Sequence, residues 1–439
     1  MSQDHEERPR LSPEALAALV AETEPDRVLA QLHALHPEDA AEVMARLPKE
    51  TLERLEPGAR LLEVVEEFAD DDAADVVARL NEDTQEYLLE ELTEGEVVEH
   101  LMTYDPETAG GLMTTDVITV RAGTTVGAAT QQIREHAPDD DRAPVFHVYV
   151  VDLDRRLTGI VPLNRIVLAS SERMVDEIAD PPEISVAPTL DQEQVARTMA
   201  RYNVTAVPVV GPRGVLLGEV TFDDVVDVVD AEQTEDLLKF GGVKATDVPY
   251  ARGSLWSALK SRGGWLSVLF VGEMATASAM GYFEHEIQRA VVLALFIPLI
   301  ISSGGNSGSQ ATSLIIRALA LGELQIKDWW RIALRELPTG IALGSVLGIV
   351  GFARIALWQE LGWYDYGPHH GLVAFTVGTA LVGVVTFGCV VGSMLPFALK
   401  RLGFDPASAS APFVATLVDV TGLVIYFTVA ALILSGTLL

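Results

Sequence analysis

Hydrophobic and polar positions follow two different patterns, which divide the chain near residue 250. Residues 1–250 mix short apolar stretches with many charged residues, whereas residues 251–439 contain five long apolar segments. A helix needs roughly 20 apolar residues to cross a bilayer. We therefore expect a head followed by a five-helix α transmembrane domain over 265–439. The expected spans are about Trp265–Phe283, Ala290–Leu321, Ile332–Trp358, Leu372–Leu399 and Pro412–Leu438.

The first part of the head, residues 1–112, has the spacing of amphipathic helices. A nine-residue motif occurs there twice, 33 positions apart: residues 39–47 read DAAEVMARL and residues 72–80 read DAADVVARL. A repeat of this length is typical of stacked helix pairs. We expect an α-helical, superhelical N-terminal domain.

From Met113 onward, β-branched runs separated by turns replace the helical spacing. The order strand–helix–strand–strand–helix occurs twice over residues 113–232, and the second copy begins with a strand expected at residues 183–186. This duplication resembles a tandem pair of α/β CBS domains, which implies an adenine-nucleotide site contacted through Thr-x-x-Asp after the last strand. Thr221 and Asp224 match that motif in the second copy, and residues 161–164 of the first copy depart from it. Alternatively, Asp224 caps the helix that follows.

Charge separates the same two regions. The chain has a net charge of −32, yet residues 251–439 hold 10 acidic and 11 basic residues, so the negative charge lies in the head. An acidic surface attracts cations and repels nucleic acid, although solubility or adaptation to high salt also explains such a surface. Asp223, Asp227 and Asp230 recur on one helical face, where like charges repel. A bridging divalent cation would relieve that repulsion, so we expect them to bind metal.

Asp419 is an acidic residue in the middle of the last apolar segment. A carboxylate at the bilayer centre costs roughly 2.5–3.5 kcal/mol on insertion scales and requires a partner or a wet cavity. The nearest basic candidates, Arg317 and Arg354, lie near the ends of other segments. We expect a cation as the partner; a neutral, hydrogen-bonded carboxylic acid is the alternative. Glu273 in the first segment is a second such acid, whose role stays open.

The second apolar segment is interrupted by SSGGNSGSQ at residues 302–310. Polar groups at this depth must be buried in protein or line a water-filled cavity. Asn306 and Gln310 are four positions apart and therefore share one helical face. We expect a pore wall; a close helix–helix contact through the small residues is the alternative.

Basic residues set the expected orientation. Lys and Arg follow the second and fourth apolar segments, whereas residues 359–371 after the third contain neither. By the positive-inside rule, the head is cytoplasmic and the C-terminus lies outside the plasma (inner) membrane. The polar N-terminus predicts no signal peptide, and lone Cys389 excludes a disulfide within the chain.

Taken together, the order of regions resembles the MgtE family of magnesium channels. The motifs that carry the resemblance are Gly304-Gly305-Asn306-x-Gly308-x-Gln310, Asp405-Pro406-Ala407 and Asp419-Val420-Thr421-Gly422. The family commonly has Asn where Ser309 and Ala411 stand. The resemblance implies a homodimer with a pore between the second and fifth segments. It also implies closure by Mg²⁺ bound to the head and to a plug helix, about Gly253–Arg262, within a connector at 233–264.

The same resemblance, with the chemistry of hydrated Mg²⁺, gives the expected pore residues. Asp419, Asn306, Ser309 and Thr416 are the expected ligands of the ion or of its waters. The expected pore-lining residues are Pro298, Gly305, Gln310, Ser313 and Ala415.

Three functional hypotheses follow. The first is a Mg²⁺-selective channel for magnesium uptake that cytosolic Mg²⁺ closes, with ATP as a second ligand of the CBS pair. The second is a transporter of Co²⁺, Ni²⁺ or Mn²⁺, although softer metals usually recruit His or Cys, and His285, His369 and His370 lie in loops. The third is a membrane-tethered nucleotide sensor. We expect no enzyme, because no nucleophile–base pair is visible and residues 304–310 lack the Lys of a P-loop.

Overall fold

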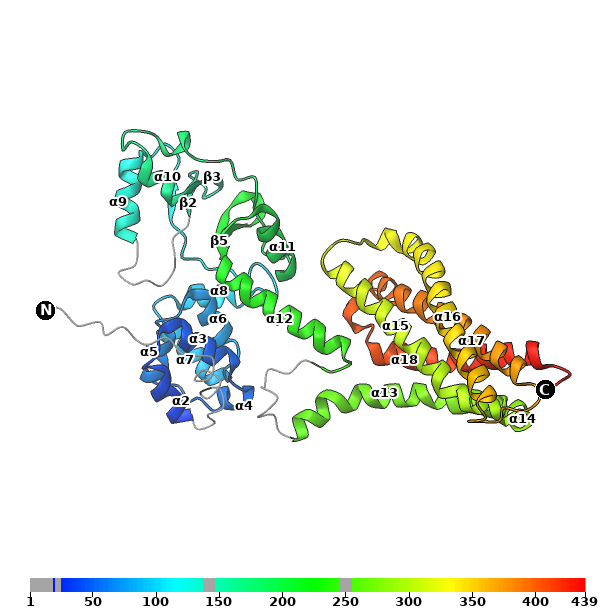
Figure 1. The fold of residues 1–439 in the computed structure, drawn as a ribbon. Helices are drawn as coiled ribbons and strands as arrows, with labels where there is room; N and C mark the ends of the chain where they lie inside the picture. Colours follow the sequence, from blue (N-terminus) through cyan, green and yellow to red (C-terminus); the bar gives the residue numbers. More distant parts are fainter. Residues whose placement is uncertain (1–18, 20–24, 137–146, 245–254, 439) are drawn as a thin grey trace. The chain divides into compact units, whose positions relative to one another are not determined.

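The computed structural model describes Leu19 and residues 25–136, 147–244 and 255–438. Among these residues the chain forms two compact units, the first ending at Glu232 and the second beginning at Gln233 (Figure 1). The start of the N-terminal domain, and residues 245–254 of the expected connector and plug helix, lie outside the described residues.

The first unit begins with short helices, as the spacing of apolar residues predicts. They are α2 (Pro25–Leu32), α3 (Pro37–Arg46), α4 (Lys49–Leu52), α5 (Ala59–Val65), α6 (Asp70–Val77), α7 (Glu82–Glu91) and α8 (Gly95–Leu101). The repeated motif falls on α3 and α6, which contact each other. The Arg79 guanidinium, at the end of the second copy, donates to the carbonyls of Ala45 and Leu47 in the first. The repeat is therefore a packing unit.

Two α/β halves complete the first unit. The first half contains β1 (Thr119–Arg121), α9 (Val126–His136), β2 (His147–Val151), β3 (Leu157–Pro162) and α10 (Leu163–Leu168). The second contains α11 (Gln192–Tyr202), β4 (Ala206–Val210), β5 (Leu216–Thr221) and α12 (Phe222–Phe240). In the first half β2 pairs parallel with β1 and antiparallel with β3, and in the second β4 and β5 are antiparallel. The strand expected at residues 183–186 is reduced to one parallel bridge, from Val186 to Val209.

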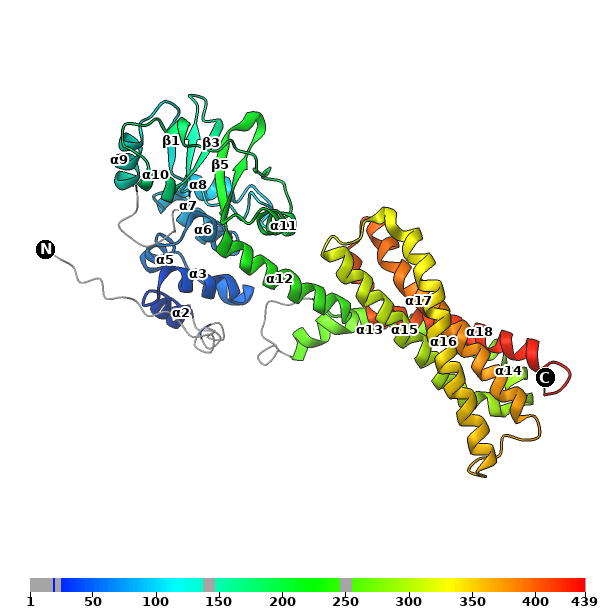
Figure 2. The ribbon, with the colours of Figure 1, turned by 45° about the horizontal axis from the view of Figure 1, so that its top comes forward.

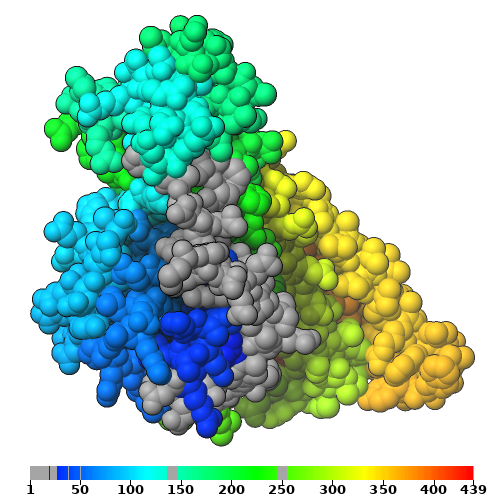
Figure 3. All heavy atoms as spheres, turned by 90° about the vertical axis from the view of Figure 1, so that its left-hand side faces the viewer, coloured from blue at the N-terminus to red at the C-terminus, as the bar shows by residue number. Residues whose placement is uncertain are grey.

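A shared hydrophobic core joins the N-terminal helices to the second α/β half. Leu88 of α7 and Val195 of α11, both fully buried, belong to that core. The first α/β half has a core of its own around Val148 and Val161. Figures 2 and 3 show the helices in blue adjoining the strand-containing part in cyan and green. The acidic helix α6 and the start of α12, through Val225, therefore share one hydrophobic core.

The second unit is helical. It contains α13 (Leu255–Tyr282), α14 (Glu284–Arg289), α15 (Ile297–Ala320), α16 (Trp329–Glu360), α17 (His370–Arg401) and α18 (Ala411–Leu434). Within the described residues, four helical stretches are long and apolar enough to cross a membrane: Val291–Ala320, Ile326–Glu360, His370–Arg401 and Ala411–Leu434. They match the last four expected spans. Helix α13 does not meet that criterion, and over the described residues the expected plug helix and first span form one continuous helix.

Glycines bring α15 and α17 into close contact. A Cβ added at Gly392 would lie 2.3 Å from the Gly308 carbonyl oxygen, and one added at Gly388 would lie 2.5 Å from that of Gly304. The Thr312 hydroxyl also donates to the Gly392 carbonyl at 2.7 Å. Small residues thus allow two backbones to approach closely inside the unit.

Candidate functional site

Helix α15 has two different faces. Gly304 and Gly308 are buried against α17, as described above. Ser302, Asn306 and Gln310 recur every four residues and are exposed in the single chain. A polar stripe on a membrane helix faces water or protein, since acyl chains cannot satisfy it. The close helix–helix contact therefore holds for one face of the helix, and the pore wall stays a prediction for the other.

Asp419 lies beside this stripe on α18. Ala415, one turn before Asp419, packs on α15, since a Cβ added at Gly305 would lie 3.5 Å from the Ala415 Cα. Val418 on the same helix is fully buried, whereas Asp419 is half-buried. Among the described residues, no hydrogen bond or ion pair involves the Asp419 carboxylate.

One of the two arginines that could have neutralised Asp419, Arg354, is engaged elsewhere. The Arg354 guanidinium stacks over the Trp358 ring at 3.9 Å and lies within hydrogen-bond distance of the Tyr366 hydroxyl, at 3.4 Å. These contacts hold it against the C-terminal turns of α16. Asp419 therefore lacks this cationic partner.

The remaining expected pore residues fall into two groups. Ser309 and Gly305 face α18: the Ser309 hydroxyl donates to the Ala411 carbonyl at 3.3 Å, and Gly305 is buried against Ala415. The Thr416 hydroxyl donates to the Pro412 carbonyl of its own helix at 3.0 Å. Pro298, Gln310 and Ser313 are exposed along α15.

In the first unit, the Thr-x-x-Asp motif is internally connected. The Thr221 hydroxyl at the end of β5 donates to Asp224 Oδ2 at 2.7 Å and also to Asp223. Burial raises the pKa of Asp224 to about 6, against the opposing hydrogen bond from Thr221. The expected metal ligands Asp223, Asp227 and Asp230 are exposed on α12.

Asp71 is a functional candidate that the sequence reasoning passed over. It lies in the first turn of α6, and its Oδ1 is buried with no hydrogen-bond partner among the residues that the structure describes. Burial, followed by repulsion from Asp224 and Asp72, holds its pKa well above the usual range for Asp. The run Asp70-Asp71-Asp72 was the available signal, but acids are ordinary in the first turn of a helix. Only the tertiary fold brings Asp71 near Asp224.

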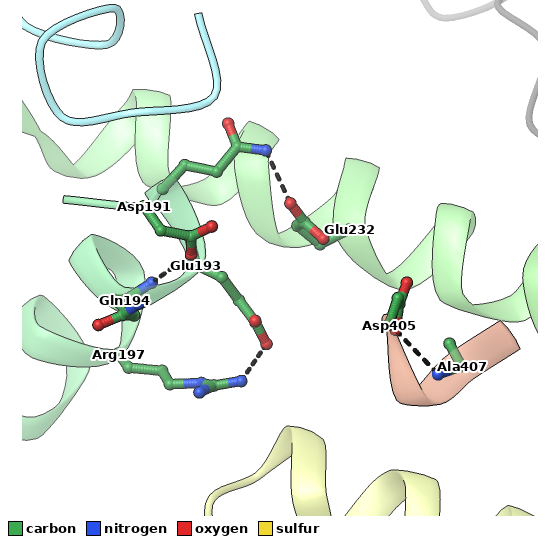
Figure 4. A network of polar contacts seen from close by, with 8 residues as sticks. Asp191, Glu193, Gln194, Arg197, Glu232, Asp405 and Ala407 are labelled. Atoms are coloured by element: carbon green, nitrogen blue, oxygen red, sulfur yellow. Dashed lines mark hydrogen bonds and ion pairs between the residues drawn. The ribbon is translucent and has the colours of Figure 1, made fainter. Parts of the chain in front are cut away.

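Other polar contacts join α11 and α12. The Gln192 amide donates to Glu232 at 2.7 Å, Glu193 pairs with Arg197, and Asp191 accepts from the backbone at the start of α11 (Figure 4).

Within the part of the chain that the structure describes, no three His, Cys, Asp or Glu residues are grouped closely enough to hold a metal ion. Mg²⁺ usually binds through one or two carboxylates and keeps several waters, so the pair Asp71 and Asp224 still fits that ion.

Together these observations define a multi-pass membrane protein with a head built from short helices and paired CBS domains. Comparison with known proteins agrees. Residues 297–429 match the family described as MgtE, divalent cation transporter, and residues 109–172 and 175–231 match CBS domains. The magnesium transporter MgtE of Thermus thermophilus is 41% identical over 79% of this chain and 74% of its own length. That of Enterococcus faecalis is 35% identical over 77% and 71%, respectively.

The chain belongs to the MgtE family. The curated relatives that match more than three quarters of the chain are magnesium transporters and not enzymes, as the absence of a catalytic motif predicted. One solved structure, the cytosolic domain of the Mg²⁺ channel MgtE in complex with ATP, is 36% identical, covers 50% of this chain and 90% of its own, and has a TM-score of 0.44.

Proposed function

We propose that this protein is a Mg²⁺-selective channel for magnesium uptake, in which α15 and α18 line the pore and Asp419 binds the hydrated ion. The observation that supports this proposal most is the half-buried Asp419 carboxylate in an apolar helix. It has no bonded partner among the described residues, and it lies beside the exposed polar stripe of α15. A neutral carboxylic acid would need a hydrogen-bond acceptor there. A passing cation supplies the missing charge.

The available ligands favour a hard cation. Asp419, Asn306, Ser309 and Thr416 offer oxygen atoms, and Mg²⁺ prefers oxygen ligands and retains much of its water. Softer metals recruit imidazole or thiolate. Cys389 is buried in α17, and the described residues contain no metal-sized group of His and Cys. A Co²⁺ or Ni²⁺ transporter is therefore the weaker candidate.

The membrane arrangement that we propose has five spans, with the head in the cytoplasm and the C-terminus outside the plasma membrane. Helix α13 joins the four apolar helices as the first span along the chain, because Leu266, Phe270 and Met274 are exposed on it and it contacts α18. The exposed polar stripe of α15 requires a water-filled or protein-covered environment in the membrane. A second copy of the chain supplies it, so that the pore lies at the interface of a homodimer.

For regulation, we propose that cytosolic Mg²⁺ closes the channel by binding the acids of the head. In this proposal the N-terminal helices are the superhelical domain expected from the repeat, in which Asp71 on α6 faces Asp224 on α12. A cation between them would remove the repulsion from Asp224 that, after burial, raises the pKa of Asp71. Asp223, Asp227 and Asp230 extend the negative surface along α12. Because α12 continues to Phe240, an ion bound at its start acts on a helix that enters the second unit.

The CBS pair is also proposed to bind ATP, with Thr221 and Asp224 contacting the ribose. Thr221 already holds the Asp224 carboxylate at 2.7 Å, which fixes its position at the end of β5. Isothermal titration of the full-length protein with ATP tests this proposal, and Thr221→Val, which removes the hydroxyl, should lower the affinity.

The proposed transport function is tested with purified full-length protein in liposomes that contain a Mg²⁺ indicator. The expected result is Mg²⁺ entry that exceeds Co²⁺ and Ni²⁺ entry under the same gradient. It should fall when Mg²⁺ is present on the side of the head. Equal entry of all three ions, or none above protein-free liposomes, would refute the proposal.

A further inference from the structure

Helices α13 and α18 run side by side in the same direction. The Trp265 Nε1 donates to the Ser410 hydroxyl at 3.1 Å near the start of both helices. A Cβ added at Gly272 would lie 3.2 Å from Thr416 Cγ2. Phe283, just after α13, stacks on Phe427 with ring centroids 5.0 Å apart. The partners in each contact are 144 or 145 positions apart, so the register is constant along the pair.

This register places Glu273 at the depth of Asp419. Applied to Glu273, the same offset leads to residues 417–418 of α18. With a rise of 1.5 Å per residue, Glu273 and Asp419 then differ by about 3 Å along the helix axes. An electrostatic interaction between the two carboxylates agrees with this placement.

Asp419 is also turned toward the space between α13 and α15. Ala415 packs on α15 and Thr416 packs on α13. At 100° per residue, the direction of Asp419 falls between those of Ala415 and Thr416. Glu273 approaches this space from α13. On α15, Ser302 of the polar stripe lies at this depth, since Ser309 contacts Ala411 and Gly305 lies opposite Ala415.

One more oxygen lies near this place. The Thr276 hydroxyl, three residues after Glu273 and hence on the same face of α13, is buried without a hydrogen-bond partner among the described residues. Two acids at one depth without a basic partner are costly in an apolar environment. A divalent cation neutralises both charges at once, whereas a monovalent cation leaves one.

Resting on the proposed transport function, we propose that Glu273 is a second carboxylate of the permeation site, which sets its preference for divalent over monovalent cations. Glu273 attracts the hydrated ion and Asp419 holds it, with the Thr276 hydroxyl available to one of its waters. Glu273 is thereby a specificity-determining residue contributed by the first span.

The test compares Glu273→Gln, Glu273→Asp and the wild type as full-length protein in liposomes. Glu360→Gln, at the end of α16, is the matched control for loss of one acid. We expect Glu273→Gln to raise the half-saturating Mg²⁺ concentration about tenfold, the order expected for losing one charge near a divalent ion. Its reversal potential in mixed Mg²⁺ and K⁺ should shift toward that of K⁺. Glu273→Asp and Glu360→Gln should stay near the wild type.

Two results would overturn the proposal. One is a Glu273→Gln variant with the half-saturation and reversal potential of the wild type. The other is an equal loss of maximal flux in Glu273→Gln and Glu273→Asp with half-saturation unchanged, which marks a structural role. Asp419→Asn, run in parallel, separates a failure of the proposed transport site from a failure of the proposed role of Glu273. If Asp419→Asn and Glu273→Gln both conduct like the wild type, the transport site itself is misplaced. If only Asp419→Asn is impaired, only the role of Glu273 fails.

Discussion

The Nζ atom of Lys239 lies 2.7 Å from Oδ2 of Asp405, a residue 166 positions further along the chain. The same Nζ is 2.7 Å from Oε1 of Glu235 on α12. Asp405 in turn accepts from the Ala407 backbone at 2.8 Å and so caps the short turn just before α18 (Figure 4). One ammonium group thereby fixes the end of α12 to the start of the helix that carries Asp419.

This contact leads to a prediction for Lys239→Met. Partial burial disfavours the ammonium, but its hydrogen bonds to Asp405 and Glu235 outweigh that effect and raise its pKa. Its loss should destabilise the contact by about 1 kcal/mol, since the side chains are partly exposed. Backbone amides of residues 235–243 should then exchange hydrogen about fivefold faster. The control is Lys244→Met, which removes an exposed side chain and should leave hydrogen exchange unchanged. Equal exchange in both variants would contradict the stabilising contact between Lys239 and Asp405.

The pair Asp71 and Asp224 predicts how the head responds to Mg²⁺. Asp71→Asn removes one of two facing carboxylates, so about tenfold more Mg²⁺ should be needed to protect α6 and α12 from hydrogen exchange. Without Mg²⁺ the variant should be better protected than the wild type, because the repulsion with Asp224 is gone. Asp83→Asn, in the exposed first turn of α7, is the control. An unchanged Mg²⁺ midpoint in Asp71→Asn would exclude Asp71 as a ligand.

The glycine contact between α15 and α17 gives a prediction about stability. Gly392→Ala places a methyl group 2.3 Å from the Gly308 carbonyl oxygen, so the helices must separate. Overpacking of this kind costs typically 1–3 kcal/mol, and more where backbone must move. Gly371→Ala in the first turn of α17 meets no atom within 4 Å and is the control. The thermal midpoint of the protein in detergent should fall for Gly392→Ala only, and equal midpoints would show that the helices can adjust freely.

Glu219 predicts a pH dependence for the CBS pair. Its carboxylate is buried in β5, accepts a hydrogen bond from the Tyr149 hydroxyl, and has a pKa raised by burial from 4.5 to about 7. A raised pKa means that the folded state holds the proton longer than the unfolded state. Stability should therefore fall as the pH rises from about 4.5 to 7, by about 3 kcal/mol.

Glu219→Gln tests that dependence. It keeps a neutral group able to accept from Tyr149, so it should stabilise the protein by about 1 to 3 kcal/mol at pH 8 and have little effect at pH 4.5. The urea concentration for half-cleavage by pulse proteolysis, measured on the full-length protein at both pH values, gives the comparison. A difference between variant and wild type that does not change with pH would contradict the buried, protonated state of Glu219.

Much of this organisation could be predicted from the sequence, because it rests on local periodicity. The 33-residue repeat predicted helices α3 and α6, and the last four spans follow from long, predominantly apolar runs. Of the strand expected at residues 183–186, only Val186 pairs, with Val209. The extent of strand pairing depends on a distant partner, which the local sequence pattern does not reveal. Helix α13 is charged at its start and contains Glu273, so its apolar character is diluted.

The candidate site could be predicted from the sequence only where a polar or charged residue stands among apolar ones. Asp419 stands out as an acid in an apolar helix, and Asn306 as an amide at membrane depth. Asp71 gives no such signal, since its significance arises from Asp224, more than 150 positions away, and from burial between packed helices. Likewise, Glu273 has an assignable role only once the register of α13 on α18 is known.

The central claim is that Asp419 binds the permeating ion, and flux through an Asp419→Asn variant tests it most directly. The side chain keeps its size and loses its charge, so folding should be retained while Mg²⁺ entry into liposomes falls at least a hundredfold, as expected when about 3 kcal/mol of ion binding is lost. Glu360→Gln should conduct like the wild type. Mg²⁺ entry through Asp419→Asn at the wild-type rate and half-saturation would contradict the account.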